Sequence, residues 1–282
     1  MSKELRTLHI HLVSDATGET THQLARAAIA QFNNVKAIEH IWTLVRSKEH
    51  LVVIEESIKK HGGVVFYSLT DRELRSSLEA ISSRYHVPSV SVLDHVVHTV
   101  SKILGQPESG VVGGQHRMDR AYFDRMEALD FTIQHDDGQG ISTVGAADIL
   151  IVGVSRSSKT PTSIYLAHRG YKVANYPLVP GIDMPLEEIP HQNMLVVGLI
   201  KDARSLSQIR RNRLVSMNEY ENSDYADLES VTEEVANARR LFNAHKWPMI
   251  DVSRRSVEET AAAIINLHSR WLEAKEDAEA KA

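Results

Sequence analysis

Runs of branched and aliphatic residues alternate with stretches of helical periodicity along nearly the whole chain, and this alternation restricts the fold more than any other feature. Each apolar run has the length of a buried strand, and each helical stretch is long enough to cross back over a sheet. Repeated β-α-β units of this kind build parallel sheets covered by helices. The sequence therefore predicts an α/β protein.

The predicted elements fall into two sets. The first half is expected to hold strands near residues 8–13, 37–45, 63–69 and 89–93 and helices near 20–32, 48–60, 71–85 and 95–104. The second half is expected to hold strands near 149–154, 195–200 and 249–252, helices near 119–134, 161–168, 206–214, 228–245 and 256–275, and a polar loop at 218–226.

A segment rich in glycine and other turn-forming residues, 105–115, separates the two sets. We interpret it as a linker, because 282 residues suffice for two modest domains. The predicted division is an N-terminal parallel-sheet α/β domain over 1–105 and a second α/β domain over 106–282, with the linker at about 105–117. The alternative is a long loop inside one domain.

Composition excludes several classes of function. The net charge of -5 provides no overall basic footprint for nucleic acid. The absence of cysteine excludes disulfides, thiolate metal sites and cysteine nucleophiles. The first residues lack the apolar core of a signal peptide, and the densest apolar run, 147–154, is too short to span a bilayer. We expect a cytoplasmic protein with neither nucleic acid nor membrane as a partner.

A loop that ends in lysine and threonine follows the most apolar predicted strand. Its sequence, Gly-Val-Ser-Arg-Ser-Ser-Lys-Thr over 153–160, approximates the phosphate-binding pattern Gly-x-x-x-x-Gly-Lys-Ser/Thr. In that pattern backbone N–H groups surround phosphate oxygens, the lysine reaches the terminal phosphates, and the following hydroxyl meets Mg²⁺. The second domain is therefore predicted to be a P-loop kinase-like, nucleotide-binding domain.

The whole loop is expected to bind the nucleotide, through Gly153, Val154, Ser155, Arg156, Ser157, Ser158, Lys159 and Thr160. Ser158 departs from the pattern, because it replaces the second glycine. Arg156 adds a bidentate anion donor. Thr160 is the expected ligand if a metal is used. The alternative, a serine-rich turn, does not explain why Lys159 and Thr160 stand where phosphate chemistry needs them.

A basic helix is expected after the next strand. Arg210 and Arg211 on it could close over the phosphates, as arginine-bearing helices of nucleotide kinases do, or could form a solvated basic face. No strand ends in an obvious acidic partner for Mg²⁺. Asp202 and Asp183 are the nearest candidates.

Three further segments accompany the loop: Ser-Asp-Ala-Thr-Gly at 14–18, a segment ending in His-Asp-Asp-Gly at 129–138, and Ala-Asn-Tyr-Pro-Leu at 174–178. Together with residues 153–163 they resemble the regulatory proteins of pyruvate, phosphate dikinase and phosphoenolpyruvate synthase, over nearly the whole chain. The Glu-Thr pair at 19–20 is more similar to the dikinase branch than to the synthase branch.

The resemblance implies a bifunctional serine/threonine protein kinase and phosphorylase. Such enzymes phosphorylate a threonine of the target with ADP as donor, which inactivates it. They also remove that phosphate with inorganic phosphate as acceptor, releasing pyrophosphate. The implied partner is pyruvate, phosphate dikinase, with phosphoenolpyruvate synthase as the alternative. The sequence permits a homodimer without specifying one.

The resemblance also suggests catalytic roles. Lys159 would neutralise charge on the transferring group, and Asp137, Asp136 or His135 could take the proton of a threonine acceptor. A helix C-terminal turn ended by Gly138 is the alternative explanation of that loop.

The N-terminal motif follows the first strand and opens a helix, the place where doubly wound sheets bind ligands. Its residues Ser14, Asp15, Thr17 and Gly18 could bind inorganic phosphate or the phosphothreonine of the target. Helix capping explains them equally well.

Two other functions share parts of the pattern. A small-molecule kinase would use the same loop and arginine helix, but it does not explain the N-terminal half. A non-enzymatic nucleotide sensor is disfavoured by the His-Asp-Asp-Gly loop.

Overall fold

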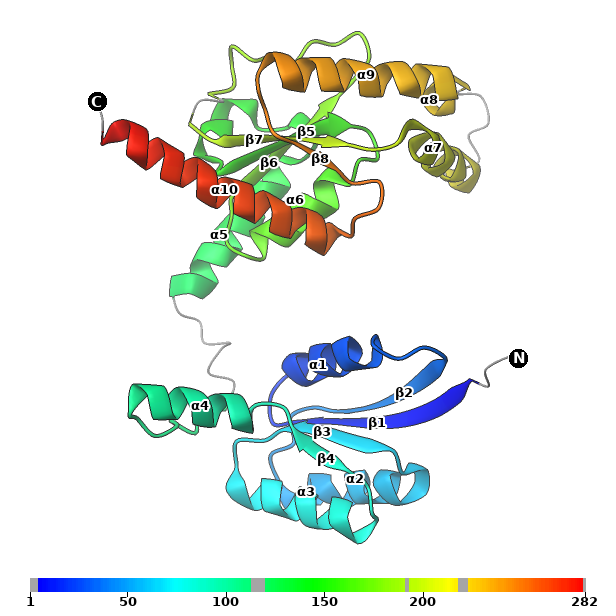
Figure 1. The fold of residues 1–282 in the computed structure, drawn as a ribbon, viewed down its shortest axis with the longest axis vertical. Coiled ribbons are helices and arrows are strands. Elements are labelled where there is room, and N and C mark those ends of the chain that lie inside the picture. Colours follow the sequence, from blue (N-terminus) through cyan, green and yellow to red (C-terminus); the bar gives the residue numbers. More distant parts are fainter. Residues whose placement is uncertain (1–4, 113–119, 191–192, 218–222, 281–282) are drawn as a thin grey trace. The chain divides into compact units, whose positions relative to one another are not determined.

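The computed structural model describes residues 5–112, 120–190, 193–217 and 223–280. The chain divides into two compact units, Met1–Arg117 and Met118–Ala282. Each unit contains one four-stranded parallel sheet with helices against it, so the predicted α/β class is confirmed (Figure 1). Residues 113–117 of the predicted linker lie outside the described residues, and the predicted domain boundary stays a prediction.

The first unit alternates strands and helices in chain order. Its elements are β1 (Arg6–Ser14), α1 (Glu19–Ile29), β2 (Val35–Trp42), α2 (Lys48–His61), β3 (Val64–Ser68), α3 (Arg72–Arg84), β4 (Ser89–Ser91) and α4 (Asp94–Leu104). The order of strands in the sheet is β2-β1-β3-β4. All eight elements were predicted from the sequence, with ends that differ by a few residues.

Alternation along β1 decides which helix covers which face of the first sheet. Ile10 and Leu12 are buried with Ala25 of α1 on one face. Val13 is buried on the other face with apolar residues of β3, α2 and α3. Asp71 fixes the start of α3, because its carboxylate accepts hydrogen bonds from two backbone N–H groups of the first turn.

The second unit begins with a helix rather than a strand. Its elements are α5 (Arg120–Gln134), the short 3-10 helices η2 (Asp136–Gly138) and η3 (Ile141–Ala146), β5 (Ile149–Val154), α6 (Lys159–Ala167), β6 (Val173–Leu178), β7 (Leu195–Ile200), α7 (Ala203–Met217), α8 (Ser223–Ala226), α9 (Leu228–Ala244), β8 (Met249–Asp251) and α10 (Val257–Glu279). The order of strands is β6-β5-β7-β8.

Besides the short 3-10 helices η2 and η3, one strand and one short helix of this unit were not predicted. β6 contains Asn175 and Pro177, which are rare in strands, but Pro177 is tolerated because β6 is an edge strand. The short helix α8 occupies part of the segment expected to be a loop, of which residues 218–222 lie outside the described residues.

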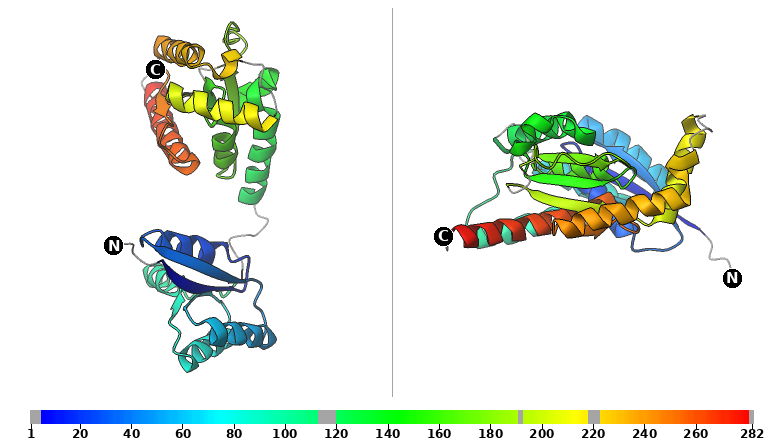
Figure 2. Two further views of the ribbon diagram at one scale, coloured as in Figure 1. Left: turned by 90° about the vertical axis from the view of Figure 1, so that its right-hand side faces the viewer. Right: turned by 90° about the horizontal axis from the view of Figure 1, so that it is seen from above.

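Helices cover both faces of the second sheet (Figures 1 and 2). Leu150 and Val152 of β5 are buried with residues of α9, whereas Ile149 and Ile151 are buried with residues of α6 and α10. The strand is thus buried on both faces, as its continuous apolar run indicated. This placement fixes the loop that follows β5 against the core of the unit.

The two sheets have the same strand order, since each places its first strand between its second and third. In such sheets the strand order reverses beside the first strand, and ligands bind beyond the carboxyl ends of the strands at that point. Residues 15–18 occupy this position in the first unit, and residues 155–158 occupy it in the second.

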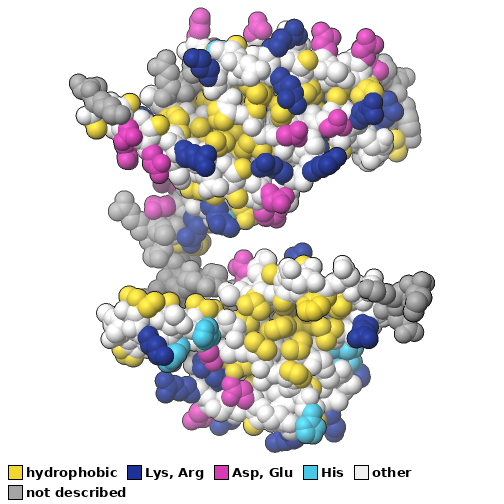
Figure 3. Space-filling view, viewed as in Figure 1, with side chains coloured by type: hydrophobic (Ala, Val, Ile, Leu, Met, Phe, Trp, Pro, Cys, Tyr) yellow, Lys and Arg dark blue, Asp and Glu magenta, His cyan; other side chains and the backbone are white. Residues whose placement is uncertain are grey.

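Two features concern the surroundings of the protein, namely the charges on its surface and the hydropathy of its helices. On the face drawn in Figure 3, basic and acidic side chains are interspersed over the second unit. No helix in the described ranges is long and apolar enough to cross a membrane.

Candidate nucleotide-binding site

The loop between β5 and α6 is tightly folded. A Cβ on Gly153 would lie 2.7 Å from Ser157 Oγ and 2.8 Å from the carbonyl oxygen of Leu199, so this position requires glycine. Arg156 and Ser158 have φ angles of 71° and 66°, in the left-handed region. Ser158 therefore adopts a conformation that the glycine of the phosphate-binding pattern would adopt without strain.

Internal hydrogen bonds hold this loop in shape. The buried hydroxyl of Ser157 donates to the Val154 carbonyl oxygen at 2.9 Å, which closes the turn. Lys159 Nζ lies 3.4 Å from the same oxygen. One turn along α6, Ser163 Oγ donates to the Lys159 carbonyl at 3.1 Å. The lysine is thus folded back over the loop rather than extended into solvent.

Lys159 is a buried cation, and in the described part of the chain its one ion pair is long. Its side chain is 6 % exposed, and the nearest carboxylate oxygen belongs to Asp137, 4.0 Å from Nζ. Burial lowers the pKa of Lys159, and the nearby charges of Asp137 and Asp136 offset this only partly. A buried ammonium with weak compensation is a candidate for binding an anion.

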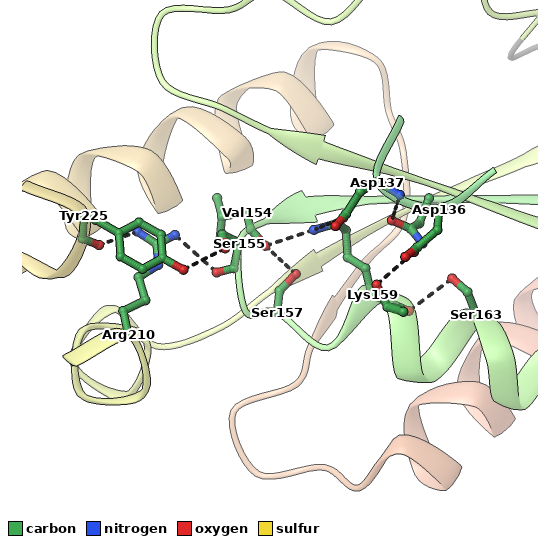
Figure 4. Close-up of polar contacts among 11 residues, drawn as sticks. Asp136, Asp137, Val154, Ser155, Ser157, Lys159, Ser163, Arg210 and Tyr225 are labelled. Atoms are coloured by element: carbon green, nitrogen blue, oxygen red, sulfur yellow. Dashed lines mark hydrogen bonds and ion pairs between the residues drawn. The ribbon is translucent and has the colours of Figure 1, made fainter. Parts of the chain in front are cut away.

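Asp136 and Asp137 reach the loop from η2. Thr160 Oγ1 donates to Asp136 Oδ1 at 2.9 Å, and Asn175 Nδ2 donates to the same oxygen at 2.5 Å. The Asn175 side-chain oxygen accepts from the backbone N–H of Asp137 at 3.1 Å. Asn175, buried in β6, therefore fixes both aspartates. Figure 4 shows Asp136 and Asp137 beside Lys159 at the start of α6.

The carboxylates of the two aspartates differ in their hydrogen bonds and in their exposure. Asp136 is engaged by Thr160 and Asn175, whereas the Asp137 side chain is 62 % exposed and lines the cavity beside the loop. Asp137 also has φ 48° and ψ 43°, a left-handed conformation that turns its side chain out of η2.

His135 lies next to the aspartates in sequence but is turned inward. The ring is buried, stacks on Phe131 with centroids 3.8 Å apart, and uses both nitrogens, on the Phe131 carbonyl at 2.7 Å and on Thr143 Oγ1 at 2.8 Å. Its backbone carbonyl accepts from Asn175 N at 3.1 Å. The structure therefore places His135 among the groups that hold η2 against β6.

Arg210 supports the opposite side of the loop. Its buried guanidinium pairs with Glu234, at 3.0 and 2.8 Å, and donates to the carbonyl oxygens of Ser155 and Tyr225 at 3.2 and 3.0 Å. Tyr225 also hydrogen-bonds to Ser155 Oγ at 3.0 Å. Arg211 is exposed and does not line the cavity.

A cavity of about 780 Å³ opens beside the loop. Among the described residues, four cations line it, Arg156, Lys159, Lys201 and Arg213, against one carboxylate, that of Asp137. Within the described residues, the buried Nε of Arg156 has no hydrogen-bond partner. Apolar and aromatic residues complete the wall, namely Pro161, Pro177, Leu178, Val179, Ile209, Leu214 and Tyr225. This combination suits a phosphate chain joined to a flat organic group.

The acidic residues considered as metal partners lie elsewhere. Asp202 accepts hydrogen bonds from the backbone and hydroxyl of Ser205 at the start of α7, and these bonds lower its pKa. Asp183 lines a different cavity, with residues of α9. Asp136, which contacts Thr160, is the carboxylate beside the expected metal ligand. Asn175, Lys201 and Tyr225 also lie at the site, although the sequence predicted no role for them. A polar residue inside a buried run was the available signal for Asn175.

A second cavity, of about 370 Å³, lies at the equivalent point of the first sheet. Ser14 Oγ accepts from Ala16 N and Ser68 Oγ, and the buried Asp15 carboxylate accepts from Thr70 N at 2.6 Å. Gly18, with φ 79°, precedes α1, and Thr17 also lines the cavity. Among the described residues its wall carries more carboxylates than cations, since Asp15, Glu19, Asp94 and Glu108 line it together with Arg75. Binding of phosphate or phosphothreonine here stays a prediction.

Comparison with protein families matches residues 10–265 to the family described as kinase/pyrophosphorylase. The match spans both sheets and includes the loop and η2.

Individual relatives are similar over almost their whole length. A protein of Caulobacter vibrioides is 52 % identical over 261 residues, covering 93 % of this chain and 83 % of that protein. One of Erythrobacter litoralis is 49 % identical over 265 residues, covering 94 % and 95 %. One of Paramagnetospirillum magneticum is 48 % identical over 273 residues, covering 97 % and 88 %. Each is provisionally named a pyruvate, phosphate dikinase regulatory protein.

Proposed function

This chain belongs to the kinase/pyrophosphorylase family, and we propose that it regulates pyruvate, phosphate dikinase by reversible phosphorylation of a threonine. The family description implies nucleotide and phosphate as substrates. In the kinase direction ADP is the donor and AMP the product. In the opposite direction inorganic phosphate accepts the phosphoryl group and pyrophosphate is released.

The observation that carries this proposal is the buried Lys159 between the loop and Asp137, in a cavity with four cations. Phosphoryl transfer requires positioning and charge neutralisation more than covalent participation of the protein. The loop would hold the phosphates of ADP on its backbone N–H groups and at the positive end of α6. Lys159 and Arg156 would neutralise charge on the transferring phosphoryl group.

A magnesium ion fits the residues present. Thr160 Oγ1 and the Asp136 carboxylate are 2.9 Å apart at the start of α6, and hydroxyl and carboxylate oxygens are ligands that Mg²⁺ accepts. These two residues would hold the ion, which would supply positive charge to the phosphate oxygens.

The proton transfers are assigned to Asp137. In the kinase direction, the threonine oxygen attacks the β-phosphorus of ADP, the bond to the bridging oxygen breaks, AMP leaves, and Asp137 takes the hydroxyl proton. In the phosphorylase direction, an oxygen of HPO₄²⁻ attacks the phosphothreonine phosphorus and the threonine oxygen leaves. Asp137 relays the proton of HPO₄²⁻ to that oxygen, so threonine and pyrophosphate are the balanced products.

Neighbouring residues would act through these groups. His135 and Asn175 position η2 and its aspartates, and Arg210 positions Ser155 and Tyr225. Arg213 and Lys201, which line the cavity, are better placed than Arg211 to contact phosphate.

Transfer of label from the β-phosphate of ADP to purified pyruvate, phosphate dikinase tests the proposal. We expect label on a threonine with ADP, no label with ATP labelled at its terminal phosphate, and none from ADP with Lys159→Ala. Subsequent addition of inorganic phosphate should release the label as pyrophosphate. Lys36→Ala, at an exposed position in the first unit, is the matched control and should retain full activity.

Phosphoenolpyruvate synthase is the second arm of the same assay. Label on the synthase and none on the dikinase would show that the synthase is the target, and the proposed reaction would stand unchanged. Transfer from ATP but not from ADP would contradict the assigned donor. Absence of transfer to both proteins, with ADP bound, would overturn the kinase proposal.

A further inference from the structure

Four histidine side chains gather on one face of the first sheet, and none of them lines the cavity of that sheet. His9 and His11 share this face because successive strand residues alternate. The register pairs His11 with His40 of β2, and His61 is the last residue of α2. Stacked ring centroids within the group are 4.7–5.3 Å apart.

Three of these rings can direct a nitrogen to the same point. One nitrogen each from His9, His40 and His61 lies within 4.8 Å of the other two. His9 Nδ1 and His40 Nε2 are 3.0 Å apart. Two nitrogens bound tetrahedrally to zinc at about 2.0–2.1 Å are about 3.3 Å apart. The first pair therefore already has ligand spacing, and rotation of the His61 side chain would complete the set.

The fourth histidine, His11, connects the cluster to the end of α2. His11 is buried, stacks on His40, and donates from Nε2 to the Gly62 carbonyl oxygen at 3.0 Å. Gly62 directly follows His61, so this bond ties β1 to the end of α2 that carries the third ring. Within the described residues, the buried Nδ1 of His11 has no hydrogen-bond partner.

Packing alone is a poor explanation of this cluster. Stacking of the imidazole rings brings several nitrogen atoms close together. The hydrogen bond between His9 and His40 pairs one such nitrogen with another. A bound cation would satisfy nitrogen lone pairs of all three rings at once.

The ligand type selects the class of ion. Mg²⁺ and Ca²⁺ prefer oxygen ligands, whereas imidazole nitrogen suits the late first-row transition ions. In the described part of the chain, the group consists of histidines alone. We propose that His9, His40 and His61 form a binding site for a divalent transition ion of the zinc class, with water in the fourth position. The ion would link β1, β2 and the end of α2, and would stabilise the folded first unit.

Zinc binding by the full-length protein, with any affinity tag removed and metal stripped by chelator, tests this site. Calorimetric titration with ZnCl₂ should give one equivalent per chain. His61→Ala and His40→Ala should each weaken binding at least about 100-fold. His98→Ala, an exposed histidine of α4, is the matched control and should bind as the wild type does. Titration with Co²⁺ should give the visible absorption of a tetrahedral site in the wild type and in His98→Ala.

Thermal unfolding distinguishes a lost ligand from a lost fold. Zinc should raise the Tm of the wild type and of His98→Ala, but not that of His61→Ala, whose Tm without metal should be close to that of the wild type. The absence of a stoichiometric zinc site would overturn the proposal. So would zinc binding that both His40→Ala and His61→Ala leave unchanged. A zinc effect on Tm that persists in His61→Ala would also contradict it.

Discussion

In the loop between β5 and α6, one residue carries a buried charge and another carries backbone strain. Lys159 carries its charge into an environment that lowers its pKa, and Ser158 holds a left-handed φ of 66° without being glycine. Both features cost stability in the free protein. If the ligand is the reason for this cost in stability, substitutions that relieve the strain or the buried charge should change stability and activity independently.

Lys159→Met should abolish phosphoryl transfer while raising the free energy of unfolding by about 1 kcal/mol. The reason is that the buried ammonium is replaced by an apolar chain of similar length. The folded state lowers the pKa of Lys159 below 10.5, so the unfolded chain binds more protons in the window between the two values. The free energy of unfolding of the wild type should therefore rise relative to that of the variant as pH rises through that window. Urea unfolding at several pH values measures this, and a variant less stable than the wild type at pH 7 would contradict it.

Ser158→Gly should stabilise the protein by about 0.5–1 kcal/mol, because glycine adopts a positive φ without strain. ADP affinity should be retained, since the phosphate-binding pattern has glycine at this position. Ser157→Gly is the contrasting variant. It removes the buried hydrogen bond to Val154 and should lower the Tm. A Tm of Ser158→Gly no higher than that of the wild type would show that φ at Ser158 carries no strain.

At the scale of elements, the site depends on contacts between η2, β6 and α6. Asn175 of β6 bonds to Asp136 and to the backbone of Asp137, and Thr160 of α6 bonds to Asp136. These contacts join segments separated by 24 and 39 residues. A change in β6 should therefore alter catalysis without touching the nucleotide loop.

Asn175→Ala should lower kcat by about 10–100-fold with little change in ADP affinity, because it frees the aspartates but leaves the loop intact. Steady-state kinetics with the protein target, together with calorimetric titration of ADP, separate the two effects. Asn212→Ala, exposed on α7, is the control. A loss confined to ADP affinity would show that Asn175 supports the loop instead.

Arg210→Ala should destabilise the second unit by about 3–5 kcal/mol, because it leaves the nearly buried Glu234 carboxylate without its partner. The exposed neighbour Arg211→Ala should change stability by less than about 0.5 kcal/mol. Denaturant unfolding of the two variants tests the contrast. Similar losses for both would contradict a supporting role specific to Arg210.

Elements with a clear apolar pattern were predicted from the sequence. Elements whose residues oppose the local propensity, and which depend on contacts with distant residues, were missed. The buried run at β5 and the alternation along β1 identified their strands directly. β6 was missed because Asn175 and Pro177 oppose strand propensity, and only its edge position and its contacts with η2 make the strand favourable. The loop was found from residue spacing. The inward orientation of His135 and the pairing of Arg210 with Glu234 depend on distant residues, which no local pattern specifies.

At the scale of the whole molecule, the chain repeats one strand order in two units and places a cavity at the same point of each sheet. The two cavities differ in charge. The second has four cations and suits phosphates, whereas the first is lined mainly by hydroxyls and carboxylates. The residues assigned to the transfer itself, Asp136, Asp137, Arg156, Lys159 and Thr160, belong to the second unit. The proposed zinc site belongs to the first, as do the residues at 14–18 that were predicted to bind phosphate or phosphothreonine.

We propose that Asp137 acts on the proton of the protein substrate while the loop at 153–160 binds ADP. Measurement of β-phosphoryl transfer from ADP to pyruvate, phosphate dikinase by Asp137→Asn, beside its affinity for ADP, tests this most directly. We expect transfer to fall by about 10²–10⁴-fold, with ADP affinity within about threefold of the wild type. Transfer at the wild-type rate would contradict the assigned role, and loss of ADP binding in proportion to transfer would show that Asp137 serves the nucleotide instead.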